Sequence, residues 1–503
     1  MFFSSKASRS QHYFSVQFPF PDRFQAMKKG RGSKAAAIAT ILFCLLLLWF
    51  HTMSLSSISR INNITATTTS STTTTTVFPT KISQEKTRVA MQTVKSQNRQ
   101  PMQRAQQVQL PLTSQISCNR TYLRYDLCSI NGPTVLDPTT STFFTMGPTS
   151  TVQVEKIKPY PRKYEDYIMA QIKELSLTSG PASPPCKIQH DAPALVFSAG
   201  GYTGNFFHDF NDGFIPLFIT VSSIFPNRDF IMVVSQARDW WPSKYADLLK
   251  VFSEHPVVTL EKDSATHCFP SATLGLMSHG FMTINHTLIP SSKTFMHFRH
   301  LLEKAYDHGR SSISSPHHRP NSLNRPRLIL VSRKHNVART IMNQEEVIQV
   351  MKEIGFDVIV FEPRRDTSLD ESYALINSSH AMVGVHGAGL THALFLRPRS
   401  VFIQVVPIGV DWAADVFFGR MARGINLEYI EYKIGVKESS LVKKYGKDNM
   451  LLKDPYALQK KGWPIEIMDI YLKEQNVKLD LLRFRKSLEG AYHLAKKFMH
   501  KEG

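Results

Sequence analysis

Residues 381–395 read AMVGVHGAGLTHALF, a short apolar run followed by a glycine-containing turn and a second apolar run. The first run, 381–385, has the length and branched side chains of a buried strand. The second, 389–396, stops two residues before Pro398, as a helix is expected to do. The stretch therefore predicts a strand, a tight turn at 386–389 and a helix.

Strands and helices alternate in the same way throughout the C-terminal half of the chain. Strands are predicted at 327–332, 357–361 and 400–406, and helices with apolar residues at helical spacing are predicted at 345–354 and 370–376. Because the strands are continuously apolar and alternate with helices, they indicate a parallel sheet covered on both faces.

The preceding half is less regular. It predicts strands at 194–198 and 230–234 and helices at 211–223 and 243–252. The stretch 309–326, rich in Ser, Pro, His and Arg with few apolar residues, separates the two halves as a linker would.

We therefore expect an α/β protein with an N-terminal domain, 118–310, and a C-terminal domain, 325–503, that face each other across a cleft. The closing stretch 477–498 is amphipathic and predicts a helix.

The first 117 residues are of a different kind. Residues 35–53 carry no charge and are long enough for a transmembrane signal anchor. Seven Lys or Arg precede them in 1–34, so the positive-inside rule makes that tail cytosolic. A cleaved signal peptide is the alternative. Residues 54–117, rich in Ser, Thr and Gln, predict a disordered stalk. A cytosolic tail, one anchor, a stalk and a folded lumenal part are the layout of a single-pass type II Golgi enzyme. Plasma-membrane receptors can have the same layout.

The formal charge of +20 is unevenly placed. Residues 1–117 hold fourteen basic and two acidic residues, which is +12 of that total. The rest of the chain shows no basic stripe with interleaved aromatics, which argues against a nucleic-acid-binding protein. Its mild positive balance suits an anionic donor such as a nucleotide diphosphate.

Five cysteines bear on the compartment. Cys44 lies in the apolar run. The other four are an even number, which fits two disulfides in an oxidising lumen. Four buried free thiols are the alternative. Those four are Cys118, Cys128, Cys186 and Cys268. Sequons for N-glycosylation occur at Asn63, Asn119, Asn285 and Asn377.

The turn at 386–389 is the first candidate site. It comprises His386, Gly387, Ala388 and Gly389, with Thr391 following. Ligands of open α/β sheets bind beyond the carboxyl ends of the strands. Glycine there lets backbone N–H groups approach a phosphate at a helix N-terminus. A plain tight turn is the alternative.

Ser332, Arg333 and Lys334 follow the strand at 327–332. An arginine at this edge could bind diphosphate oxygens in a fork, and a surface salt bridge is the alternative. Glu362, after the strand at 357–361, is a candidate to accept hydrogen bonds from a ribose or base, or is a solvated strand end.

The N-terminal half offers a third cluster, GNFFHDFND at 204–212. Transfer of a sugar to a hydroxyl needs a base for the acceptor proton. His208 could serve, steered by Asp212 four residues on, and Asp209 is the rival base. An N-capping and packing cluster is the alternative.

No two aspartates in the chain are separated by one residue. Glycosyltransferases that hold their donor through a divalent metal usually carry such a D-x-D motif. We therefore expect no metal cofactor, with Arg333 and backbone amides neutralising the leaving diphosphate.

Together these segments resemble glycosyltransferase family 61. The resemblance rests on GNFFHDFND at 204–212, LVSR at 330–333, VGVHGAGLT at 383–391 and the LFLRP continuation to Pro398, and it covers roughly 118–500. It implies a GT-B fold, with two Rossmann-like domains, and an inverting transfer from a UDP-sugar.

The family's N-x-x-H-x-x-x-D pattern falls on Asn205, His208 and Asp212, which favours these over Asp209. The anchor and stalk look like the plant branch, whose members add arabinofuranose or xylose to xylan in the Golgi. The resemblance thus implies a UDP-pentose donor and a xylan acceptor, and it leaves room for complexes with other wall glycosyltransferases.

Three other functions stay open on the sequence. The chain could be a catalytically silent scaffold subunit of a wall-polysaccharide complex, or transfer N-acetylglucosamine to protein as the animal members do. It could also use a nucleotide donor other than a sugar, as a sulfotransferase does.

Overall fold

The computed structural model describes residues 115–146, 152–180, 182–307, 324–333, 337–459 and 464–502, all within one compact unit, Gln106–Gly503. The predicted tail, the anchor, the Asn63 sequon and the stalk up to residue 114 lie outside the described residues, as do Lys334 and most of the linker. The end of the predicted stalk was wrong, because Ile116 and Ser117 already belong to a strand, Ile116–Asn119. Within the described ranges, no helix is both long and apolar enough to cross a bilayer.

The C-terminal half, 324–502, is built on a five-stranded parallel sheet, which confirms the predicted parallel layout. Its strands, in spatial order, are β14 (Asp357–Phe361), β13 (Arg327–Val331), β15 (Ala381–Val385), β16 (Val401–Val406) and β17 (Glu428–Lys433). The order of strands along the chain reverses between β13 and β15. That reversal is the topological switch point at which open α/β sheets bind their ligands.

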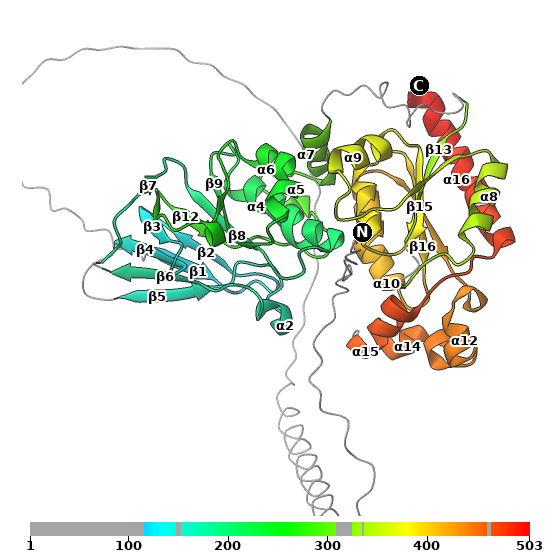
Figure 1. Ribbon diagram of the computed structural model, residues 1–503, viewed down its shortest axis with the longest axis horizontal. Coiled ribbons are helices and arrows are strands. Elements are labelled where there is room, and N and C mark those ends of the chain that lie inside the picture. Colours follow the sequence, from blue (N-terminus) through cyan, green and yellow to red (C-terminus); the bar gives the residue numbers. More distant parts are fainter. Residues whose placement is uncertain are drawn as a thin grey trace, which may run out of the picture. The chain divides into compact units, whose positions relative to one another are not determined.

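Both faces of this sheet are covered, since every position of the central strands β13, β15 and β16 is buried. Leu328 and Leu330 of β13 pack on one face with α8 (Gln344–Ile354) and α16 (Leu481–Glu502). Ile329 packs on the other with α9 (Leu369–Asn377) and the 3₁₀ helix η4 (Ala388–Phe395). Figure 1 shows α8 and α16 on one side of the strands and α9 on the other. The predicted helices are thus confirmed, except that the third one is a 3₁₀ helix.

Shorter helices complete this half. They are α10 (Asp411–Ala414), the π-helix η5 (Asp415–Gly419), α11 (Arg420–Gly424), η6 (Val436–Glu438), α12 (Leu441–Tyr445), α13 (Met450–Lys453), α14 (Pro455–Gln459), α15 (Ile465–Asp469) and the π-helix η7 (Ile470–Glu474).

The N-terminal half, 115–307, contains two six-stranded sheets (Figure 1). The first is ordered β1 (Ile116–Asn119), β2 (Leu127–Ile130), β12 (Ala272–Leu274), β8 (Ala194–Ala199), β9 (Ile231–Ala237), β10 (Val258–Thr259). The second is ordered β5 (Gln153–Ile157), β6 (Leu175–Gly180), β4 (Thr142–Met146), β3 (Thr134–Asp137), β11 (His267–Phe269), β7 (Ile188–Gln189).

A shared core joins these two sheets. Val196 of β8 and Val233 of β9 pack in one cluster with Phe143 of β4 and Leu177 of β6. The sequence predicted β8 and β9 but missed the second sheet, whose strands are two to six residues long and too short for a periodic signal. This half is therefore α/β only around β8 and β9, and the expectation of a simple Rossmann-like domain was wrong for the rest.

Most helices of the N-terminal half lie after β8, and α2 precedes it, between β5 and β6. They are α2 (Asp166–Met169), α3 (Phe206–His208), the π-helix η1 (Asp209–Phe214), α4 (Ile215–Ile224), α5 (Trp241–Lys244), α6 (Ala246–Phe252), η2 (Leu260–Lys262), η3 (His286–Leu288) and α7 (Phe295–Tyr306). The predicted helix at 211–223 is the continuous run η1–α4, and the one at 243–252 is divided between α5 and α6.

The two halves share a core instead of each closing on its own. Phe298 of α7 and Phe395 of η4 belong to one buried cluster. Arg299 of α7 donates through Nε to the carbonyl of Leu396 at 2.7 Å and through Nη2 to Oδ1 of Asn377 at 2.7 Å. Asn377 is thereby half-buried, whereas the sequon residues Asn119 and Asn285 are exposed.

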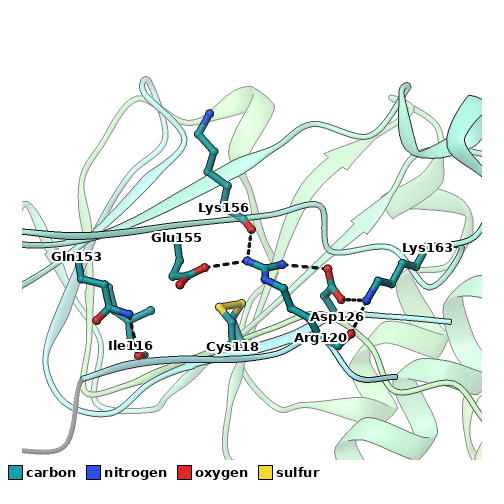
Figure 2. The surroundings of a disulfide bond; sticks show 9 residues. Ile116, Cys118, Arg120, Asp126, Gln153, Glu155, Lys156 and Lys163 are labelled. Carbon is teal, nitrogen blue, oxygen red and sulfur yellow. Dashed lines mark hydrogen bonds and ion pairs between the residues drawn. A yellow bond between two sulfur atoms is a disulfide. The ribbon is translucent and has the colours of Figure 1, made fainter. Parts of the chain in front are cut away.

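All four cysteines outside the apolar run form disulfides, Cys118–Cys128 and Cys186–Cys268, which confirms the expected number. Cys118 and Cys128 are direct partners across β1 and β2. Figure 2 shows that Arg120 next to this disulfide bridges Asp126 at 3.0 Å and Glu155 at 2.9 Å. The bridge ties the β1–β2 turn to β5 of the other sheet.

The two disulfides are expected to differ in their contribution to stability. Cys186–Cys268 closes a separation of 82 residues and Cys118–Cys128 one of 10 residues. Because the entropy removed from the unfolded chain grows with loop length, Cys186→Ser/Cys268→Ser should lower the free energy of unfolding by about 4 kcal/mol and Cys118→Ser/Cys128→Ser by about 3 kcal/mol. Denaturant unfolding of the two double variants measures both losses, and a larger loss for the shorter loop would contradict the pairing.

Candidate functional site

The candidate site begins where β13 and β15 end. These strands are adjacent and parallel, so Arg333 and the turn at 386–389 leave the sheet at the same edge. The sequence predicted this juxtaposition from the strand ends alone, and the structure places the two segments in contact.

Arg333 lies directly against Gly387. A Cβ atom at position 387 would clash with Nη1 of Arg333 and would lie 3.3 Å from Nη1 of Arg339. Arg339 also donates through Nη1 to the carbonyl of His386 at 2.8 Å. A side chain at 387 would therefore have to displace the end of Arg333, so the glycine is what lets the guanidinium groups lie against the turn.

The two guanidinium groups are enclosed without a compensating acid. Within the described residues, neither Arg333 nor Arg339 forms an ion pair with a carboxylate, and the Nε atom of each is buried without a hydrogen-bond partner. Burial lowers the pKa of Arg333, and burial together with the charge of Arg333 lowers the pKa of Arg339 to about 9. Two like charges held together in this way suit an anion with several oxygens.

The sequence analysis did not find Arg339. It follows β13 by eight residues and adopts a left-handed backbone, with φ of 65°, which is uncommon for a residue other than glycine. Its amide donates to the carbonyl of Gln475 at 2.6 Å. No motif in the sequence marks this residue, and only its contact with His386 does.

His386 is buried and held in one tautomer. Nε2 of Gln404 lies 2.8 Å from Nδ1 of His386, while Oε1 of Gln404 accepts from the hydroxyl of Tyr429 at 2.6 Å. An amide nitrogen can only donate, so Nδ1 accepts and the proton resides on Nε2. Burial, followed by the charges of Arg339 and Arg333, lowers the pKa of His386 well below its usual value. The imidazole is therefore a neutral hydrogen-bond donor.

The remaining predicted donor-side residues divide between two cavities. Ser332, Arg333 and Glu362 line one of about 640 Å³, although Ser332 already donates to Oε1 of Gln344 at 2.7 Å. Ala388 and Gly389 line another of about 250 Å³. Thr391 is buried, and its hydroxyl has no hydrogen-bond partner within the described part of the chain.

The smaller cavity lies between the two halves. Asp209, Trp240 and Lys244 line it from the N-terminal half, and Arg364 and His392 line it from the C-terminal half. Residues of both halves thus line one cavity at this edge of the sheet.

His208 and Asp212 form the predicted pair. Nδ1 of His208 lies 2.8 Å from Oδ2 of Asp212. Nη2 of Arg162 also lies 3.2 Å from Nδ1. The carboxylate can only accept and is the nearer partner, so we assign the Nδ1 proton to the contact with Asp212, which leaves Nε2 to act as a base. The side chain of His208 is 18% exposed, whereas that of Asp212 is 3% exposed. The imidazole can therefore reach a substrate, and the carboxylate cannot.

Two residues that the sequence analysis missed hold Asp212. Arg162 donates through Nε to Oδ1 of Asp212 at 2.8 Å, and the hydroxyl of Tyr160 donates to Oδ2 at 3.1 Å. Burial alone would raise the pKa of Asp212, but Arg162 and His208 outweigh it and lower that pKa to about 2. Arg162 lies 50 residues before Asp212, so no local pattern could connect them.

Asp209 points elsewhere. It accepts from the hydroxyl of Tyr245 at 2.8 Å and from the amide of Gly204 at 3.3 Å, and it lines the smaller cavity. Burial raises its pKa to about 6. Asp209 and His208 thus lie on different sides of the α3–η1 segment. Asn205 caps α3 by accepting from the amide of Phe207, so part of the cluster has the capping role that was the alternative.

Aromatic rings connect this segment to the C-terminal half. Phe206 stacks on His392 with ring centroids 4.1 Å apart. The ring of Phe417 in η5 lies 4.9 Å from that of Phe207 and 6.1 Å from that of His386. One phenylalanine thus stands beside both the His208 segment and the arginine-lined turn. π-Helices, which often mark functional sites, carry Asp209 and Asp212 on one side and Phe417 on the other.

Comparisons with known proteins agree with this geometry. Residues 204–403 match the family described as Glycosyltransferase 61. The chain is 40% identical to the xylan glycosyltransferase MUCI21 of Arabidopsis thaliana, over 76% of this chain and 81% of that protein. It is 35% identical to the alpha-1,3-arabinosyltransferase XAT3 of Oryza sativa subsp. japonica, over 79% of this chain and 67% of that protein. It is also 35% identical to the beta-1,2-xylosyltransferase XYXT1 of the same organism, over 67% of this chain and 72% of that protein.

The arginine pair should destabilise the empty protein and bind a diphosphate. Arg339→Met keeps most of the side-chain volume and removes one uncompensated charge, so the free energy of unfolding should rise by on the order of 1 kcal/mol. Pyrophosphate should raise the melting temperature of the unaltered protein and have little effect on Arg339→Met.

Thermal unfolding with and without pyrophosphate measures both effects. Arg420→Met, which alters an exposed arginine paired with Asp415, is the matched control. A variant at Arg339 that is less stable yet still responds to pyrophosphate would contradict this reading of the pair.

Proposed function

This chain belongs to glycosyltransferase family 61, and on that premise we propose that it is an inverting transferase of a pentose, arabinofuranose or xylose, from a UDP-sugar to the xylan backbone or its side chains. The observation that carries the proposal is the arginine pair at Gly387, with the segment of the His208–Asp212 pair connected to it through the rings of Phe207 and Phe417. The name of the Arabidopsis relative supports xylan as the acceptor, and the names of the two Oryza relatives support arabinose or xylose as the transferred sugar.

The arginine pair would bind the diphosphate of the donor. Arg333 and Arg339 supply two positive charges at the edge of the sheet where nucleotides bind. His386 adds a neutral N–H that burial prevents from titrating. These groups are fixed before the reaction, so they stabilise the charge that develops on the leaving diphosphate without reorganising.

His208 would act as the general base. The acceptor hydroxyl oxygen attacks the anomeric carbon from the face opposite the diphosphate, and its proton passes to Nε2 of His208. The new C–O bond forms as the bond to the diphosphate oxygen breaks, and UDP leaves with that electron pair. A single displacement inverts the anomeric configuration.

Asp212 would orient His208 and stabilise its protonated form. Asp212 stays ionised because its pKa is about 2, so it can balance the imidazolium that forms after proton transfer. Arg162 and Tyr160 keep the carboxylate in place. Asp209 could instead be the base, since a pKa of about 6 leaves it mostly ionised at neutral pH.

We also propose that the reaction needs no metal ion. The two guanidinium groups supply the positive charge that a divalent cation would otherwise bring.

Architecture and location complete the proposal. The cavity between the halves and the parallel sheet of the C-terminal half support a GT-B type arrangement. The two disulfides support an oxidising compartment. A Golgi membrane protein with residues 35–53 as its signal anchor and a lumenal catalytic part fits both.

A donor screen tests the function. The purified protein is incubated with xylo-oligosaccharides and with UDP-xylose or UDP-arabinofuranose, and products are identified by mass spectrometry and by the anomeric configuration of the new linkage. We expect transfer from one of these donors, with inversion, and the same rate in the presence of EDTA. Absence of transfer from both donors would reject the function, and loss of activity in EDTA would reject metal independence alone.

Replacing the proposed base separates it from its rival. His208→Gln keeps a polar side chain but cannot take the proton, so kcat should fall by about 10²–10⁴-fold while the KM for the donor changes little. His300→Gln, at an exposed histidine of α7, is the control and should leave kcat unchanged. If Asp209→Asn lowers kcat more than His208→Gln does, then Asp209 is the base.

A further inference from the structure

A strip of aromatic side chains passes beside His208 and crosses from one half to the other. We name it the aromatic strip. It consists of Tyr167, Tyr164, Tyr202, Phe281 and Trp412. Three of these rings are well exposed, Trp412 at 50%, Tyr167 at 46% and Tyr164 at 41%.

The strip is continuous through ring and guanidinium contacts. Tyr167 and Tyr202 meet edge to face, with centroids 6.3 Å apart. The guanidinium of Arg162 lies 5.4 Å from the ring of Tyr202 and 5.0 Å from that of Phe281. Phe281 in turn lies 6.1 Å from Trp412. The rings therefore form one surface.

This surface adjoins both parts of the proposed reaction centre. The ring of Tyr202 stacks on that of His208 at 4.1 Å and 19°. At the other end, Trp412 and Phe281 both contact Phe417, which also lies beside His386. A molecule lying on the strip would thus pass His208 on its way to the arginine-lined turn.

The rings are held in place before any ligand arrives. The hydroxyl of Tyr164 accepts from Nη1 of Arg124 at 2.8 Å, and that of Tyr202 donates to Oε2 of Glu165 at 2.8 Å. Phe281 packs against the guanidinium of Arg124 at 4.3 Å. A preorganised surface loses little side-chain entropy on binding.

The chemistry of the strip indicates a neutral sugar chain. Contiguous exposed aromatic faces are typical of binding sites, and an aromatic face packs well on the flat C–H face of a pyranose ring. The guanidinium of Arg162 is buried and already pairs with Asp212 at 2.8 Å and with Glu165 at 2.6 Å. That of Arg124 contacts the hydroxyl of Tyr164 and the ring of Phe281. A chain of uncharged pyranoses would find apolar faces and tyrosine hydroxyls along this surface.

We propose that the aromatic strip binds the acceptor, a chain of uncharged pyranose rings, with successive rings lying on successive aromatic faces and one hydroxyl presented to His208. This inference rests on the proposed function and specifies its acceptor site. It implies that the enzyme acts on a polymer held over several rings, because the strip spans both halves and exceeds what a single sugar would cover.

Chain-length dependence tests the strip. Intact protein is assayed with xylo-oligosaccharides of increasing length, and KM for the acceptor should fall as the chain becomes long enough to reach Trp412. Trp412→Ala should raise KM for the longest acceptor by about 3- to 10-fold, the contribution expected of one aromatic face. It should leave KM for the shortest acceptor and for the UDP-sugar unchanged.

Tyr456→Ala, which removes an aromatic ring that is 72% exposed and belongs to α14, is the matched control and should change none of these values. Equal length dependence in Trp412→Ala and the unaltered protein would overturn the proposal.

Calorimetry with a xylo-oligosaccharide in the absence of donor keeps the two proposals separable. If the unaltered protein transfers no sugar but binds the oligosaccharide, and Trp412→Ala weakens that binding, the strip stands and the proposed function fails. If transfer occurs but neither Trp412→Ala nor Tyr164→Ala weakens binding, the function stands and the strip fails. Binding of no oligosaccharide at all also rejects the strip and would leave a protein partner as its occupant.

Discussion

The parallel pairing of β13 with β15 is the constraint on which the donor side of the site depends. It places the end of LILV at 328–331 beside the end of AMVGV at 381–385, so that Arg333 and Gly387 leave the sheet together. The missing side chain at 387 then lets two guanidinium groups close over the turn. Removing either the pairing or the glycine would separate the charges from the backbone that they flank.

The site carries an electrostatic cost in the empty protein. Arg333 and Arg339 share a buried position with no carboxylate among the described residues, and the pKa of Arg339 falls to about 9 as a result. Asp212 shows the opposite arrangement, because Arg162, His208 and Tyr160 compensate its charge fully. The two arginines thus have no acidic partner until an anion binds, whereas Asp212 already has its partners. That difference agrees with assigning the arginines to donor binding and Asp212 to the positioning of His208.

The C-terminal half and part of the site could be predicted from the sequence because their signals are local. Continuous apolar strands, the glycine-containing turn and an arginine just after a strand fix both the parallel sheet and the edge at which Arg333 meets Gly387. The His208–Asp212 contact follows from a four-residue spacing on one helical segment. The second N-terminal sheet escaped prediction because strands such as β7 and β11 have two and three residues, which is too few to show a period.

The sequence by itself determined the α/β class, the parallel sheet, the edge where a phosphate could bind and the family to which the chain belongs. Tertiary structure alone decided that Arg339 joins Arg333, that Arg162 and Tyr160 hold Asp212, and that Asp209 turns away from His208 and lines the cavity between the halves. It also decided that rings as distant in sequence as Tyr164 and Trp412 form one surface. The physical reason is the range of the interactions. Hydrophobic periodicity and helical spacing act between near neighbours in the chain, whereas charge compensation and ring packing act between whatever side chains the fold brings within a few ångströms.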